Sequence, residues 1–195
     1  MVKLQGGSAM KIHQHFSVIG FCNTYIVGNR ETKEALIIDP GHADYELIRL
    51  IEEFEYTIKA VFLTHRHSGH TEGLSLLSKL YHFDTYAYVM NDLAPNPKPI
   101  TPNKKIHVAS FDVLPLLIGG HSSDSIVFLI EDALFSGDTL HASHVGKTYT
   151  NRLKQELITN LTALLSHLNP ETLIFPGHGP PSTVQSEFLF NLSLT

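Results

Sequence analysis

The 195-residue chain has only one cysteine, Cys22, and no hydrophobic run long enough to cross a bilayer. One cysteine excludes an internal disulfide, and a membrane-spanning helix needs about 20 consecutive apolar residues. The first ten residues, MVKLQGGSAM, also lack the apolar stretch of a secretory signal. We therefore expect a protein of the reducing cytoplasm with no membrane partner.

Clusters of lysine and arginine are missing as well. The formal net charge is −5, and the 14 basic residues are spread along the chain. Binding to a nucleic-acid backbone requires a concentrated basic surface, so this composition argues against nucleic-acid partners. A small molecule is the expected partner, and the sequence carries no indication of the oligomeric state.

The length and composition are those of one globular domain. A hydrophobic content of 43% and a charged content of 17% are ordinary values, and a chain of this length can bury a sufficient core. Residues 1–9 contain GGS and precede a second methionine, Met10, so we interpret them as a flexible leader or a cloning remnant. Residues 10–195 are expected to form a single domain.

In the first half of the chain, segments with the apolar pattern of strands alternate with segments in which apolar residues recur at helical spacing. Short runs rich in β-branched and aromatic residues predict strands, whereas Leu47, Ile48 and Ile51 recur at the spacing of one helix face. Leu74 and Leu77 indicate a second helix in the same way. The predicted order is strands at 11–16, 22–28 and 34–40, a helix over 44–56, a strand at 60–65, the second helix, and a strand at 84–89.

The second half begins with a proline-rich segment. Four prolines fall between residues 91 and 103, which we interpret as a surface loop without regular structure. Leu153, Leu157 and Leu161 begin the apolar stripe of a long helix further along the chain. The other predicted elements are strands at 105–110, 113–119, 124–130, 133–138 and 172–177, and a short final helix. The fold class is therefore α/β.

Thirteen histidines are more than a core or a solvated surface normally contains. Four polar motifs follow predicted buried strands, and each contains histidine or aspartate. Any one of these motifs alone is more often an ordinary turn. However, loops at strand ends commonly carry functional residues, and imidazoles with a carboxylate are typical zinc ligands. The motifs are THRHSGH at 64–70, GGHS at 119–122, SGDTL at 136–140 and FPGHGP at 175–180.

Together with IDPG at 38–41, this ordered series resembles the metallo-β-lactamase superfamily, whose pattern is an H-x-H-x-D-H cluster, a distant histidine, an aspartate and a final histidine. The resemblance covers the chain from about Met10 to its end. It implies an αββα sandwich, with two mixed sheets and helices outside, and two metal positions that share Asp138. The first position would be held by His65, His67 and His121, and the second by His70 and His178.

The chain departs from the family pattern at Gly69, which stands where the family has the aspartate of its first cluster. The second position keeps two imidazoles and a shared carboxylate, so we expect weak or no metal there. His141 and His144 could supply further ligands but are better interpreted as pocket-edge or surface residues. Asp39, in IDPG, resembles the family aspartate that steadies the metal ligands from behind.

The expected cofactor is zinc, as one or two ions, with iron or manganese as alternatives. A metal with an open position lowers the pKa of bound water toward about 7 and polarises a substrate oxygen. Hydrolysis through a metal-bound hydroxide then needs no protein nucleophile. In agreement, a G-x-S-x-G elbow is missing, and we expect Cys22 to lie far from the histidine clusters.

Within the superfamily the chain is most similar to short single-domain proteins of the glyoxalase II type, the hydroxyacylglutathione hydrolases. GDTLHASHVGKTY at 137–149 resembles their substrate loop and places Lys147 and Tyr149 where the family contacts glutathione. The resemblance implies hydrolysis of a small thioester or ester. Two alternatives stay open: a non-catalytic metal-binding member, and a mononuclear Fe(II) persulfide dioxygenase whose iron is held by His65, His121 and Asp138.

Overall fold

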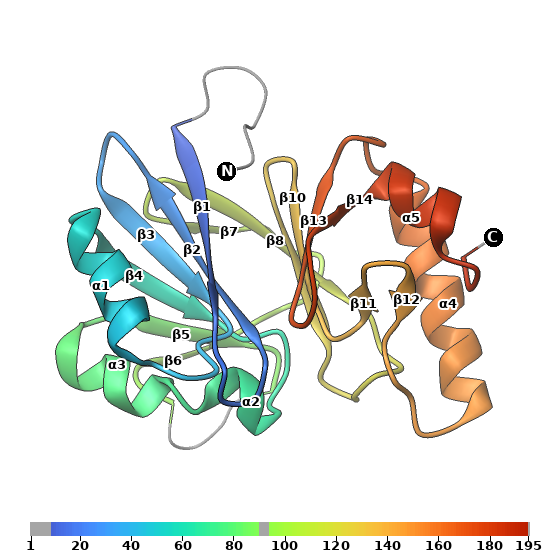
Figure 1. The fold of residues 1–195 in the computed structure, drawn as a ribbon, viewed down its shortest axis with the longest axis horizontal. Helices are drawn as coiled ribbons and strands as arrows, with labels where there is room; N and C mark the ends of the chain where they lie inside the picture. Colours follow the sequence, from blue (N-terminus) through green and yellow to red (C-terminus); the bar gives the residue numbers. More distant parts are fainter. Residues whose placement is uncertain (1–8, 90–93, 195) are drawn as a thin grey trace.

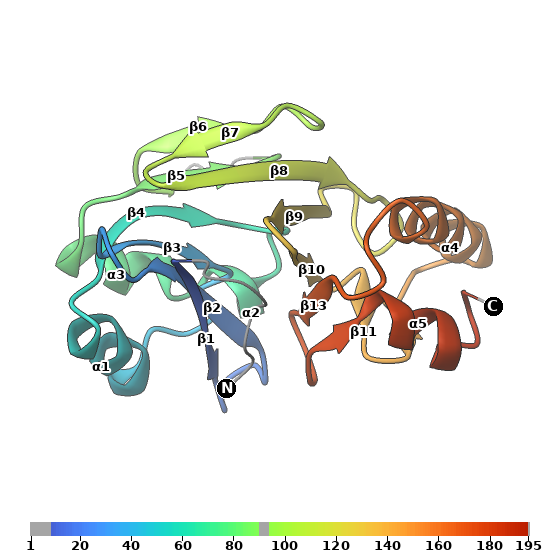
Figure 2. The same ribbon diagram turned by 90° about the horizontal axis from the view of Figure 1, so that it is seen from above.

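The computed structural model describes residues 9–89 and 94–194. Residues 1–8, which make up most of the expected leader, and residues 91–93, at the start of the proline-rich segment, lie outside the described residues. Two mixed sheets face each other, and helices cover their outer faces (Figure 1, Figure 2). This arrangement confirms the expected αββα sandwich.

The first sheet has an antiparallel and a parallel half. Its strands, in sheet order, are β1 (Met10–Phe16), β2 (Asn23–Asn29), β3 (Glu34–Ile38), β4 (Thr57–Phe62), β5 (Asp84–Ala87) and β6 (Pro97–Pro99). β1, β2 and β3 pair antiparallel, whereas β3 to β6 run parallel. On the outer face, Leu47 of α1 (Tyr45–Glu53) and Leu77 of α3 (Leu74–Leu80) pack in one cluster with Ile26 and Ile37.

The second sheet is antiparallel except for one pair. Its strands, in sheet order, are β14 (Ser182–Thr183), β13 (Leu173–Pro176), β10 (Ala133–Gly137), β9 (Ile126–Ile130), β8 (Phe111–Leu117) and β7 (Ile106–Val108), with β10 and β13 parallel. Leu157 of α4 (Asn151–Leu165) and Val184 of α5 (Val184–Phe190) pack in its outer cluster with Leu134 and Ile174. A small hairpin of β11 (Leu140–His141) and β12 (His144–Val145) precedes α4. None of the described helices has the length and apolar character of a membrane span.

The main core lies between the two sheets and is rich in aromatic side chains. Tyr25 of β2 contacts Phe135 of β10 at a centroid distance of 5.5 Å, and Phe62 of β4 contacts Phe128 of β9 at 5.2 Å. All four side chains are buried. Such rings bury large areas and prefer tilted contacts, so this layer holds the sheets in a defined relative position.

One prediction about the first sheet was wrong. The proline-rich segment is not a loop throughout, because Pro97–Pro99 form β6, which pairs with β5. Proline has no N–H to donate, but an edge strand tolerates it because only one side of the strand must pair. The hydrogen bonds come from residues next to the prolines: Thr85 N donates to Asn96 O, and Ile100 N donates to Ala87 O.

Candidate metal centre

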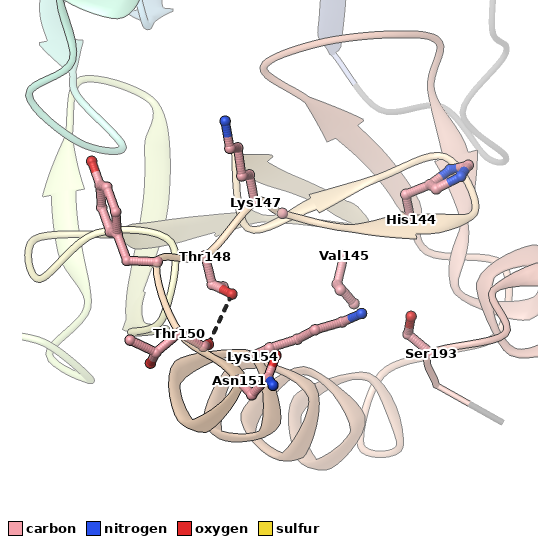
Figure 3. A pocket seen from close by; sticks show the side chains of 10 residues that line it. His144, Val145, Lys147, Thr148, Thr150, Asn151, Lys154 and Ser193 are labelled. Atoms are coloured by element: carbon pink, nitrogen blue, oxygen red, sulfur yellow. Dashed lines mark hydrogen bonds between the residues drawn. The ribbon is translucent and has the colours of Figure 1, made fainter.

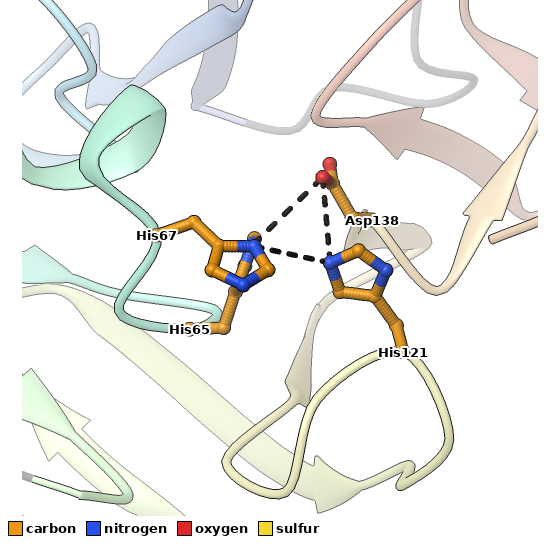
Figure 4. A group of neighbouring side chains, drawn as sticks. All are labelled: His65, His67, His121 and Asp138. Atoms are coloured by element: carbon orange, nitrogen blue, oxygen red, sulfur yellow. Dashed lines mark hydrogen bonds and ion pairs between the residues drawn. The ribbon is translucent and has the colours of Figure 1, made fainter. Parts of the chain in front are cut away.

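Six side chains from the four motifs gather on loops that follow β4, β8, β10 and β13. Their donor atoms form two groups, and within each group all donor atoms lie within 4.8 Å of one another. Figure 4 shows the first group, in which three imidazoles and one carboxylate point toward a common centre. The first group is His65, His67, His121 and Asp138, and the second is His70, on α2 (Ser68–Thr71), with Asp138 and His178.

The distances between donor atoms in the first group suit a cation with tetrahedral coordination. His67 Nδ1 lies 2.9 Å from His65 Nε2 and 3.2 Å from His121 Nε2. Asp138 Oδ2 lies 3.8 Å from His65 Nε2 and 3.6 Å from His121 Nε2. Four atoms bound to one zinc ion at about 2.0–2.1 Å are about 3.3 Å apart, so the donor atoms are close to the spacing of tetrahedral coordination.

The second group has three donor residues where the first has four. Asp138 Oδ1 lies 3.3 Å from His70 Nε2, and Asp138 Oδ2 lies 3.6 Å from His178 Nε2. Oδ1 is buried and has no well-aligned hydrogen bond. A buried carboxylate oxygen in this state is costly unless a cation compensates for its lost hydration.

Hydrogen bonds on the outer side of the rings determine which nitrogen faces the centre. His121 Nδ1 donates to Lys147 O at 2.9 Å, and His178 Nδ1 donates to Phe21 O at 2.7 Å. Because carbonyl oxygens only accept, Nδ1 of both rings carries the hydrogen and the Nε2 lone pairs turn inward. These outward bonds are typical of metal-binding histidines.

A buried carboxylate, Asp39, connects two of the histidines. Asp39 Oδ2 accepts hydrogen bonds from His70 Nδ1 at 3.0 Å and from Thr64 Oγ1 at 2.6 Å. Since Thr64 Oγ1 donates its hydrogen to Asp39, it accepts from His65 Nδ1 at 3.1 Å. Asp39 therefore orients His70 directly and His65 through Thr64. The sequence interpretation included Asp39 but missed Thr64, whose only signal is its place directly before His65.

Burial and the two carboxylates give the histidines different charges. Burial lowers the pKa of His65 to about 4, so this ring is neutral near pH 7. Burial also lowers the pKa of His70, but the carboxylates of Asp39 and Asp138 prevail and raise it to about 10. For Asp138, burial raises the pKa, but the His178 and His70 rings beside its carboxylate prevail and hold the pKa far below the usual range. The negative charge that holds a proton on His70 would also attract a metal cation.

A second buried carboxylate joins two of the three loops that supply the first group. Asp124, which is 6% exposed, accepts hydrogen bonds from Arg66 N at 3.1 Å, from Arg66 Nε at 3.0 Å and from Ser122 Oγ at 2.7 Å. Arg66 lies between His65 and His67, so the contact ties their loop to the one that carries His121. These two loops are far apart along the chain, and no pattern in the sequence indicated the pair.

Two glycines near the second group differ in the space around them. A Cβ at Gly177 would lie 2.6 Å from Asp138 Oδ1 and 2.6 Å from His70 Cε1, so only glycine fits there. A Cβ at Gly69 would meet no atom within 4 Å. The position of the family aspartate therefore has room for a side chain.

The expectation that Cys22 lies far from the histidine clusters was wrong. Its Sγ donates to Gly69 O at 2.6 Å, because the turn after β1 brings Cys22 back against α2. Separation along the chain did not indicate this contact. Burial raises the pKa of the thiol to about 11, so it is protonated near pH 7 and is a poor nucleophile.

The expected substrate residues Lys147 and Tyr149 lie between β12 and α4. Their loop lines a pocket of about 600 Å³, in which Figure 3 shows the Lys147 side chain pointing away from α4. Tyr149 is 84% exposed and also borders a groove of about 1080 Å³ that is lined by His67 and His121. This larger groove adjoins the first donor group, whereas none of the six clustered residues lines the smaller pocket.

His141 and His144 stay outside both donor groups. His141 Nδ1 donates to His178 O at 3.1 Å, so this residue supports the loop of a clustered histidine. His144 is exposed, and its Nδ1 donates to Ala142 O within its own turn. His144 also lines the smaller pocket, whereas His141 lines neither the pocket nor the groove.

Comparison with known proteins identifies a family. A model described as the metallo-beta-lactamase superfamily matches residues 18–178, a range that contains all six clustered residues. The hydroxyacylglutathione hydrolase of Hydrogenovibrio crunogenus (strain DSM 25203 / XCL-2) is 29% identical over 153 residues, which are 77% of this chain and 55% of that protein. The chain thus spans about half the length of this relative.

Two solved structures share the fold. ETHE1 from Myxococcus xanthus is 27% identical, with a TM-score of 0.81 over 94% of this chain and 84% of that chain. TTHA1623, determined in a di-iron-bound form, is 26% identical, with a TM-score of 0.76 over 92% of this chain and 98% of that chain.

Proposed function

Because the chain belongs to the metallo-β-lactamase superfamily, we propose that it is a metal-dependent hydrolase of a small thioester or ester, of the glyoxalase II type. The observation that carries this proposal is the convergence of the four donor atoms of the first group beside a large groove. The similarity to a hydroxyacylglutathione hydrolase supports a thioester as the substrate class.

The donor set fits the metal that this proposal requires. His65, His67, His121 and Asp138 would hold one ion, and His70, His178 and Asp138 would hold a second ion more weakly. Their imidazole and carboxylate groups suit zinc, and iron or manganese are compatible with them. When bound, the metal lowers the pKa of a coordinated water and polarises the carbonyl of the substrate.

The protein residues keep this site in one charge state and one geometry. Asp138 stays ionised because of its low pKa, and its buried Oδ1 has no well-aligned hydrogen bond, so this carboxylate is ready to bind a cation. His65 stays neutral and can present its lone pair. Asp39 and Thr64 hold the rings of His65 and His70 in place, so little reorganisation is needed when the substrate binds.

The groove next to the first group offers polar contacts for the part of the substrate that does not react. Arg66, Glu156, Asn160 and Tyr149 line it. Charged, amide and hydroxyl groups at this place can bind a polar thiol carrier and orient its thioester bond toward Asp138. Tyr149 remains a proposed substrate contact, and Lys147 is proposed on the resemblance alone.

The test combines metal analysis with turnover. Protein purified without added metal is analysed for zinc, iron and manganese per chain and assayed with S-lactoylglutathione before and after chelation. We expect Asp138→Ala to lose more metal and activity than any single histidine variant, because it removes the only carboxylate of both groups. His82→Ala, which changes an exposed histidine outside the groups and both pockets, is the matched control. Full metal content and activity in Asp138→Ala would contradict the proposal.

The incomplete second group favours one alternative. His65, His121 and Asp138 form a set of two histidines and one carboxylate, which suits a single Fe(II) and does not need a carboxylate at Gly69. A persulfide dioxygenase would use such a set. Iron as the dominant metal, with oxygen consumption on glutathione persulfide and no thioester hydrolysis, would replace the hydrolase proposal with this one.

A further inference from the structure

Four large apolar side chains are exposed within one short stretch, residues 16–21. Phe16, Val18, Ile19 and Phe21 are 52%, 72%, 53% and 67% exposed, and we call them the apolar rim. Single exposed apolar residues are common on protein surfaces, but a contiguous patch marks a binding surface. The rings of Phe16 and Phe21 lie 6.4 Å apart, so the two ends of this stretch face each other.

The loop that carries the apolar rim is held by its own hydrogen bonds. Ser17 N donates to Cys22 O at 2.9 Å, and Ser17 Oγ donates to Ile19 O at 2.7 Å. Ser17 is 1% exposed, so the polar residue faces inward while its apolar neighbours face solvent. An ordinary surface loop has the reverse arrangement. The loop therefore presents the rim in a defined shape.

The loop borders the second donor group. Phe21 O accepts the hydrogen bond from His178 Nδ1, and Cys22 contacts Gly69 O. A Cβ at Gly20 would lie 3.7 Å from Gly69 Cα, so the tip of the loop rests against α2, which carries His70. A substrate whose carbonyl reaches Asp138 is therefore close to the loop.

The backbone of Phe21 is strained in a way that serves this placement. Its φ is 53°, in the left-handed region that is unfavourable for a bulky side chain. This conformation turns the carbonyl toward His178 while the ring stays in solvent.

We propose that the apolar rim binds the acyl group of the substrate, so that the preferred thioesters carry an aliphatic or aromatic acyl chain. This inference rests on the proposed hydrolase function. It follows from the different chemistry next to the two donor groups, because Arg66 and Glu156 line the groove at the first group, whereas the rim at the second is apolar. The polar thiol carrier then lies in the groove and the acyl chain lies on the rim.

The first experiment measures binding without turnover. Acetate, butyrate and hexanoate are acid products of such a reaction for any thiol carrier, and their affinities for the zinc-loaded protein are measured by NMR titration. We expect the affinity to rise about 2- to 4-fold for each methylene that the rim covers. In the double variant Val18→Ser, Ile19→Ser, the affinity should no longer rise with the chain length of the carboxylate. Leu189→Ser, at a 64% exposed position on α5, is the matched control and should preserve the rise.

The second experiment measures turnover of S-acetyl-, S-butyryl- and S-hexanoylglutathione. We expect kcat/KM of the wild type to rise with acyl length and the ratio of hexanoyl to acetyl values to fall in the double variant. If carboxylate affinity rises with length but no thioester is cleaved, the proposed function fails and the acyl site stands. Carboxylate affinity without any dependence on length would overturn the acyl site even if thioesters are hydrolysed. The acyl site is equally overturned if the double variant changes only sedimentation or vesicle binding and leaves both length series intact.

Discussion

At the scale of single residues, Thr64 shows how a metal centre can depend on a side chain that binds no metal. Its hydroxyl donates to Asp39 and accepts from His65, so one oxygen links the carboxylate to a ring of the first group. Thr64 is 2% exposed, which leaves water no easy access to replace these bonds. The orientation of His65 therefore rests on this hydroxyl.

Replacing the hydroxyl tests this dependence. Thr64→Val keeps the side-chain volume but leaves His65 Nδ1 without its acceptor, so we expect metal affinity to fall by about 10- to 100-fold. Affinity is measured by competition with a chromogenic chelator. Thr85→Val is the control, because Thr85 is also buried and hydrogen-bonded, to Pro95 O, but contacts neither donor group. Equal affinities in all three proteins would show that Thr64 has no orienting role.

Gly69 is the residue at which the chain departs from the family pattern. Because a Cβ there meets no atom within 4 Å, we expect Gly69→Asp to fold and to supply a carboxylate to His70 and His178. The metal content should rise from about one toward two per chain, and thioester hydrolysis should increase because a second cation stabilises the developing charge. Gly69→Ala fills the same space without charge and should leave the metal content unchanged. Two metals per chain in the wild type would disprove this expectation.

At the scale of elements, the packing of β1 against the segment between α1 and β4 introduces a pH-sensitive contact. The His13 ring of β1 lies 4.2 Å from the Phe54 ring, and its Nε2 lies 3.0 Å from Tyr56 Oη. Burial, with the positive charges of Lys11 and Arg30, lowers the pKa of His13 to about 4. The folded protein therefore holds this ring neutral.

This lowered pKa makes the folded state sensitive to acid. In the unfolded chain His13 takes up a proton below about pH 6.5, whereas in the folded protein it does so only near pH 4. The unfolded state thus binds more protons between these values, and stability falls as the pH falls through this window. The free energy of unfolding, measured with urea on metal-free protein, should fall between pH 7.5 and pH 5 in both proteins. In His13→Gln it should fall by about 1 kcal/mol less than in the wild type, after allowance for the partial exposure of the ring. The control is His82→Gln, at an exposed position, for which the free energy of unfolding should fall by as much as in the wild type.

At the scale of the whole molecule, the donor residues come from both halves of the sandwich. His65, His67 and His70 follow β4 of the first sheet, whereas His121, Asp138 and His178 follow strands of the second. A cation held by these residues would link the two sheets at one edge. It would bind only the folded protein, because the donors are brought together by the packing of the sheets.

Metal removal should therefore destabilise the protein. At a free zinc concentration about 100 times the dissociation constant, binding stabilises the folded state by about 2.7 kcal/mol, which corresponds to a shift of roughly 5–10 °C in Tm for a chain of this size. We expect a chelator to lower Tm by this amount and added zinc to restore it. In Asp138→Ala, the Tm should be the same with zinc and with the chelator. A Tm that does not respond to zinc would show that the metal does not link the sheets.

The sequence by itself determined most elements and the identity of the clustered residues. The spacing of apolar residues and the residues typical of turns are local properties, so most strands and the helices α1, α3 and α4 could be predicted from neighbouring residues. The ordered motifs indicated the six clustered side chains. The two-residue strands β11, β12 and β14 were missed because they are too short to show a period. The strand at Pro97–Pro99 was missed because only its place at the sheet edge makes proline acceptable there.

The tertiary structure decided which distant residues support the centre. Cys22 against Gly69, Asp124 against Arg66, and the apolar rim beside His178 all join segments far apart along the chain. No local pattern encodes such pairs, because they depend on how loops of two sheets meet once the aromatic core between them has packed. The open space at Gly69 has the same origin, since the residues that surround a position are set by the packing of the whole fold.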